Sequence, residues 1–77
     1  MIDEKKTMAL KIGMECAREA WEQRTLDVDG KIYINTCPMQ GDWDYLDFKM
    51  PAASEKDKDA FYAAYTKEIE DMLRRNG

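Results

Sequence analysis

Three aspartates stand close together in the segment GDWDYLDFKM, residues 41–50, where they could bind a divalent cation. Asp42, Asp44 and Asp47 supply carboxylate oxygens, which are the ligands that Mg²⁺ and Ca²⁺ prefer. In a β-strand, however, successive side chains point to opposite faces, so Asp47 would point away from the other two. The segment therefore predicts acids at a turn and strand end, and no metal site.

The residue types for nucleophilic catalysis are missing from the chain. It has no histidine, which removes the commonest general base and with it the Ser-His and Cys-His pairs. Ser54 is the sole serine, and its position favours a helix cap. No phosphate-binding loop is recognisable either. The sequence therefore predicts a non-enzymatic protein without a cofactor.

The segment DVDGKI, residues 27–32, partly matches the calcium loop of an EF-hand. Thr25 stands where the first acidic ligand should be, and Thr36 stands where the bidentate glutamate should be. The residues that follow are typical of a strand and not of a helix. We therefore expect no calcium site here.

The two cysteines, Cys16 and Cys37, are far apart and have no histidine to complete a zinc site. We expect both thiols to be reduced and buried, with a disulfide as the alternative. No apolar run approaches the roughly 20 residues that span a bilayer. The N-terminal residues lack the apolar segment of a secretory signal, so a cytoplasmic protein is expected.

Residues 3–23 have the pattern of a helix, since good helix formers dominate and no proline interrupts them. Lys11 with Glu15, and Arg18 with Glu22, are pairs of opposite charge four residues apart on its polar stripe. The apolar positions cover more than half of the circumference, whereas a surface helix needs about 100°. Two explanations remain open: contact with both a sheet and a second helix, or contact with another chain.

Residues 54–75 predict a second helix. Ser54 is a candidate N-cap, and acids follow it in the first turns. Arg74 and Arg75 suit the C-terminal end of the helix dipole. Pro51 marks the boundary on the N-terminal side.

Between these helices the apolar period changes to two, which predicts strands at about 25–28, 31–37 and 43–50. The fold class expected is thus α+β, in the order α-β-β-β-α, as a single domain of residues 1–77. A three-stranded antiparallel sheet would have both helices on one face.

The register of the first hairpin stays open at the Asp29-Gly30 turn. A two-residue turn would place Leu26 opposite Tyr33, whereas a three-residue loop with a bulge at Gly30 would turn Leu26 towards Ile32.

The second and third strands would place their apolar residues on the helix-covered face, with Ile34 opposite Leu46 and Ile32 opposite Phe48. Their other face would be open, aromatic and acidic. Because tryptophan and tyrosine are common in binding hot spots, we expect this face to bind a partner; plain cross-strand packing is the alternative. The expected partner-binding residues are Tyr33, Trp43, Tyr45, Asp42, Asp44 and Asp47.

The excess negative charge concentrates between the helices. Residues 25–53 hold five acids against Lys31 and Lys49, a net charge of −3, while the whole chain carries −4. An acidic face repels phosphate backbones and attracts basic surfaces. The function expected is therefore a protein-interaction module that binds a basic protein, such as an inhibitor or regulator from a phage or mobile element. A homodimer through the same face is the close variant.

The order helix, three strands, helix is similar to that of the double-stranded RNA-binding domain. The resemblance covers element order and length, and it implies a nucleic-acid-binding domain as the alternative function. That family has a histidine in a strand loop and a lysine cluster at the start of its last helix. Here Lys56 and Lys58 alternate with acids and histidine is absent, so nucleic acid is not the expected partner.

Overall fold

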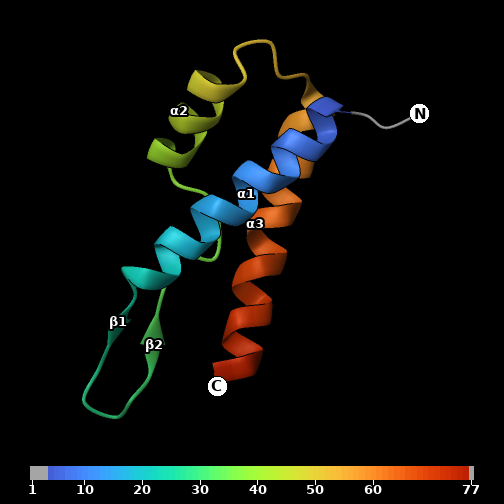
Figure 1. The fold of residues 1–77 in the computed structure, drawn as a ribbon. Helices are drawn as coiled ribbons and strands as arrows, with labels where there is room; N and C mark the ends of the chain where they lie inside the picture. Colours follow the sequence, from blue (N-terminus) through green and yellow to red (C-terminus); the bar gives the residue numbers. More distant parts are fainter. Residues whose placement is uncertain (1–3, 77) are drawn as a thin grey trace.

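Residues 4–76, which the computed structural model describes, form three helices and one two-stranded antiparallel sheet (Figure 1). In chain order the elements are α1 (Glu4–Glu22), β1 (Thr25–Leu26), β2 (Ile32–Tyr33), α2 (Gln40–Lys49) and α3 (Glu55–Asn76). The expected fold class, with a three-stranded sheet and two helices, is wrong. The expected third strand is a helix, and the other two strands are much shorter than expected.

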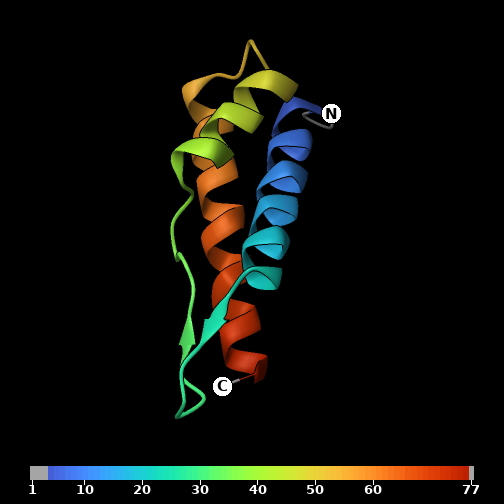
Figure 2. The same ribbon diagram turned by 90° about the vertical axis from the view of Figure 1, so that its left-hand side faces the viewer.

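The two long helices, α1 and α3, run in the same direction and pack along each other (Figures 1 and 2). They approach closely at Gly13, where a Cβ atom would lie 2.5 Å from the carbonyl oxygen of Phe61 and 3.0 Å from the Cβ of Ala64. Ala9 and Ala17, one turn before and after Gly13, are fully buried. Small side chains at a spacing of four residues therefore set the distance between α1 and α3.

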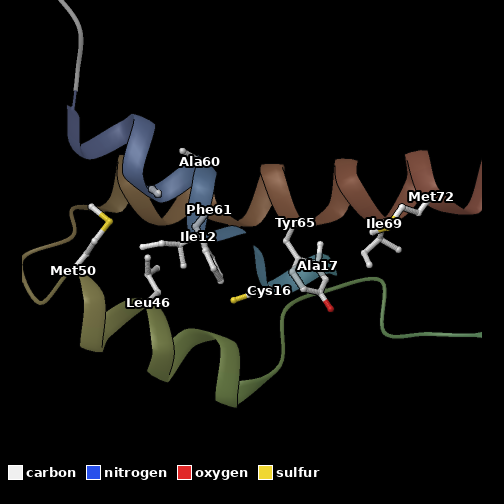
Figure 3. Packing of buried hydrophobic residues seen from close by; sticks show 11 residues of the cluster. Ile12, Cys16, Ala17, Leu46, Met50, Ala60, Phe61, Tyr65, Ile69 and Met72 are labelled. Carbon is white, nitrogen blue, oxygen red and sulfur yellow. The ribbon is translucent and has the colours of Figure 1, made fainter. Parts of the chain in front are cut away.

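The hydrophobic core lies where α2 covers the pair formed by α1 and α3 (Figure 3). Leu46 points from α2 towards Ile12 and Phe61, and Met50, which directly follows α2, is buried beside them at the end of the core. Leu46 and Phe61 are fully buried, as is Tyr65 further along α3. The core thus depends on α2 as its third wall.

Several local interactions favour a helix at residues 40–49. The Asp42 carboxylate accepts a hydrogen bond from the backbone N–H of Met39 (2.9 Å), and Gln40 donates to Asp44 one turn later (3.0 Å). Asp42 in the first turn and Lys49 in the last suit the helix dipole. The apolar residues fit a helix as well as a strand, because the residues at 43, 46 and 50 share one helical face.

The hairpin adopts the three-residue loop, one of the two registers that the sequence leaves open. Leu26 pairs with Ile32 and Thr25 pairs with Tyr33. Gly30 has a φ of +83°, the left-handed conformation that glycine adopts at low cost. The pairs of Ile34 with Leu46 and of Ile32 with Phe48 were wrong, because the third strand does not form.

Asp27 organises the hairpin loop, and this predicts a pH dependence. Its carboxylate accepts hydrogen bonds from the backbone N–H of Lys31 and of Asp29 (both 2.9 Å) and from the Tyr33 hydroxyl (3.3 Å). The bond from Lys31 is the main cause that lowers the pKa of Asp27 below its usual 3.8, with those from Asp29 and Tyr33 adding to it. The ionised Asp27 carboxylate therefore stabilises the folded loop fully above pH 3.8. This stabilisation is lost as the pH falls through the lowered pKa and the carboxylate is protonated.

The amide chemical shifts of Asp29 and Lys31 should therefore move together in acid, below about pH 4. The variant Asp27→Asn should remove this pH-dependent step while the amide shifts of α1 and α3 stay unchanged. Identical acid titrations in the two proteins would contradict the role of Asp27.

The helix α3 begins at a reciprocal cap. The backbone N–H of Asp57 donates to the Ser54 hydroxyl (3.2 Å), and the Asp57 carboxylate accepts from the Ser54 N–H (3.0 Å). Glu68 in the middle of α3 pairs with Arg18 of α1 at 3.6 Å. None of the helices in the described part of the chain is long and apolar enough to cross a membrane.

Candidate interaction groove

An open groove of about 970 Å³ lies between the C-terminal half of α1, the hairpin and the start of α2. Three parts of the chain that are separated in sequence line it. The lining residues are Glu15, Cys16, Glu19, Ala20, Gln23, Arg24, Thr25, Tyr33, Ile34, Asn35, Met39, Gly41, Asp42 and Tyr45. The hairpin projects beyond the C-terminal end of α1, while α2 lies towards the N-terminal ends of α1 and α3 (Figures 1 and 2).

Carboxylates dominate the charged lining of the groove. Glu15 and Glu19 stand one turn apart on α1, and Asp42 faces them from α2. The guanidinium of Arg24 lies over the Trp21 ring, 4.4 Å from its centroid, and donates to the Trp21 carbonyl (2.9 Å). This basic group is thus engaged at the end of α1, and the groove keeps a negative character.

Asp42 connects the groove to the core beneath it. Burial, followed by the charge and hydrogen bonding of Asp42, raises the pKa of the Cys16 thiol to about 12. Burial and the same carboxylate raise the pKa of Tyr65 to about 12 as well. Cys16 is therefore a neutral thiol at physiological pH and a poor nucleophile. Tyr65 is neutral too, and its hydroxyl donates to the carbonyl of Asn35 at 3.1 Å.

Two exposed tyrosines stand on the groove lining. Tyr33 on β2 is 51% exposed and Tyr45 on α2 is 38% exposed. The Lys31 ammonium lies over the Tyr33 ring, 5.5 Å from its centroid, and the Lys49 ammonium lies 5.7 Å from that of Tyr45. Each ring therefore already binds a cation, one that the chain itself supplies.

The structure brings together half of the six residues expected to bind a partner: Tyr33, Tyr45 and Asp42 all line the groove. The remaining three are placed elsewhere on α2. The continuous aromatic-acidic sheet face does not form, because residues 43–50 belong to a helix and its end and not to a strand.

Trp43 packs against α3 and is not part of the groove lining. Its ring lies 4.9 Å from that of Phe61 and 6.5 Å from that of Tyr62, in the contact between α2 and α3. Asp44 accepts the bond from Gln40, and Asp47 is exposed. Neither acid is among the described residues that line the groove.

The two cysteines are free, and they differ in environment. Cys16 is buried and Cys37 is exposed, so the expectation of burial is wrong for Cys37. The Cys37 sulfur lies 3.2 Å from the Tyr62 hydroxyl. Within residues 4–76, no group of three or more histidine, cysteine, aspartate or glutamate side chains could hold a metal ion.

Sequence reasoning missed Glu15 and Glu19 as site residues. Glu15 was assigned to a surface pair with Lys11, and Arg18 to a pair with Glu22. Arg18 instead binds Glu68 of α3. One sequence signal was available, because Glu15 and Glu19 lie one helical turn apart beside Cys16 and therefore border the apolar face of α1.

Searches of protein-family models, of curated proteins and of solved structures found no significant match to this chain.

Proposed function

We propose that the protein is a non-enzymatic interaction module that binds a basic segment of another protein in the groove between α1, the hairpin and α2. The partner is still a basic protein, as the charge distribution indicates. The binding surface is the groove and not the sheet face expected from the sequence. A cytoplasmic location belongs to the same proposal and accords with two free thiols.

One observation carries the proposal: Glu15, Glu19 and Asp42, from two separate helices, line one groove together with two exposed tyrosine rings. Carboxylates on both sides of a groove give a potential that attracts a cationic chain and sets its orientation. Tyrosine rings add contact area and bind cations over their faces. The volume of about 970 Å³ leaves room for several side chains of a partner.

The test is calorimetric titration with a six-residue peptide of alternating arginine and lysine at low ionic strength. The double variant Glu15→Gln with Glu19→Gln should weaken binding by about fivefold or more, since each exposed ion pair contributes up to about 1 kcal/mol. Both glutamates are exposed, so the fold should tolerate the change. Asp42 is left intact because its carboxylate caps α2.

The matched control is Asp59→Asn with Glu70→Gln, which removes the same charge from exposed positions on α3 outside the groove. A general attraction between an acidic protein and a basic peptide would weaken equally in both double variants. Equal weakening, or no binding by the unaltered protein, would overturn the proposal.

A further inference from the structure

Two lysines of the chain, Lys31 and Lys49, lie over the tyrosine rings that line the groove, although neither lysine is itself among the lining residues. Lys31 and Tyr33 lie two residues apart in the hairpin, and Lys49 follows Tyr45 by one turn of α2. Both ammonium groups lie within 6 Å of their ring centroids, the range in which a cation is attracted to the ring face. A partner that inserts its own cations there must compete with two groups that are always present.

We infer that the groove selects arginine-rich segments over lysine-rich ones, because guanidinium groups displace the ammonium groups of Lys31 and Lys49 from the Tyr33 and Tyr45 rings. This inference rests on the proposed function and specifies the chemistry of the partner. The two lysines then act as built-in competitors that keep lysine-rich segments out.

The selectivity follows from the difference between the two cations. A guanidinium is planar, stacks on an aromatic ring and is more weakly hydrated than an ammonium. Exchanging Lys31 or Lys49 for a partner lysine replaces one ammonium by another and gains nothing at the ring. Exchanging it for arginine gains stacking, and a guanidinium also binds a carboxylate through two parallel hydrogen bonds, for which the groove offers Glu15, Glu19 and Asp42.

The hairpin keeps Tyr33 in place during such an exchange. Its hydroxyl donates to Asp27, whose carboxylate also binds two backbone N–H groups of the loop. The ring therefore stays where it is when Lys31 moves away. The backbone of Tyr45 is held in place too, because the next residue of α2, Leu46, is fully buried in the core.

The experiment compares hexa-arginine and hexalysine peptides by calorimetry at one ionic strength. The unaltered protein should bind hexa-arginine about tenfold more tightly than hexalysine. Two cation–π contacts at exposed sites contribute about 1–2 kcal/mol, which corresponds to roughly this ratio of affinities. The double variant Lys31→Gln with Lys49→Gln should bind hexalysine more tightly and reduce the ratio to about threefold or less.

The control is Lys56→Gln with Lys67→Gln, which makes the same change of net charge at exposed positions of α3. This variant should bind both peptides more tightly by the same factor, so the ratio of the hexa-arginine affinity to the hexalysine affinity should not change. If the unaltered protein bound both peptides with equal affinity, the arginine selectivity would be overturned. If the Glu15→Gln with Glu19→Gln variant then bound both peptides more weakly, the proposed function would still stand. A ratio that falls equally in both lysine variants would overturn the competitor role. Absence of binding by either peptide would overturn the inference together with the function.

Discussion

Replacing Gly13 with alanine is expected to destabilise the protein, although alanine is the better helix former. The new Cβ would lie 2.5 Å from the carbonyl oxygen of Phe61, a backbone atom that cannot rotate away. The two long helices would have to separate, and overpacking of this kind costs about 1–3 kcal/mol. The gain in helix propensity is about 1 kcal/mol and offsets only part of that cost.

Gly41 offers the same substitution without the obstacle. No atom lies within 4 Å of a Cβ built there, on the exposed start of α2. Gly41→Ala should therefore leave the free energy of unfolding unchanged or raise it by up to about 1 kcal/mol. Urea titrations followed by circular dichroism measure both variants. A Gly13→Ala protein as stable as the unaltered chain would contradict the close approach of α1 and α3.

Replacing Leu46 with aspartate should have the largest effect of any change in α2. Leu46 is fully buried against the core. Truncating a buried leucine already costs about 2–5 kcal/mol, and a buried carboxylate without a partner adds to this. A domain of this size is stabilised by roughly 4–12 kcal/mol in total. We therefore expect α2 to detach or the chain to unfold, with a large loss of helical circular dichroism.

Phe48→Asp is the matched control, and it distinguishes a helix from a strand. Phe48 is 78% exposed on α2, so a carboxylate there should change the unfolding free energy by about 0.5 kcal/mol or less. In a strand, Leu46 and Phe48 would share the buried face, and both substitutions would be severe. Comparable destabilisation by both aspartates would contradict the helical assignment of residues 40–49.

The long helices and the turn were accessible from the sequence, because their signals are local. The Ser54 cap and the glycine at position 30 act within a few residues of themselves. Residues 40–49 are ambiguous, since their apolar positions fit a period of two and a period of 3.6. The Asp42 cap favours the helix, and so does the contact of Leu46 with the core formed by α1 and α3, which involves residues far away in the sequence.

The candidate site was half predictable for the same reason. Tyr33, Tyr45 and Asp42 stand out by residue type and charge, and these properties hold whichever element carries them. Trp43 was assigned to the partner surface only because a strand would have exposed it, whereas the helix turns it onto Phe61. Glu19 lines the groove because the hairpin lies beside the end of α1. That placement of the hairpin depends on tertiary packing.

The most direct test of the groove is a titration of isotope-labelled protein with the alternating arginine-lysine peptide, followed by amide chemical shifts. We expect changes that concentrate on Glu15 and Glu19 of α1, on Asn35 and on Asp42, all on the groove lining. Changes confined to the exposed outer side of α2 around Phe48 would contradict it. If those changes grew with protein concentration in the absence of peptide, they would indicate a homodimer in place of a basic partner.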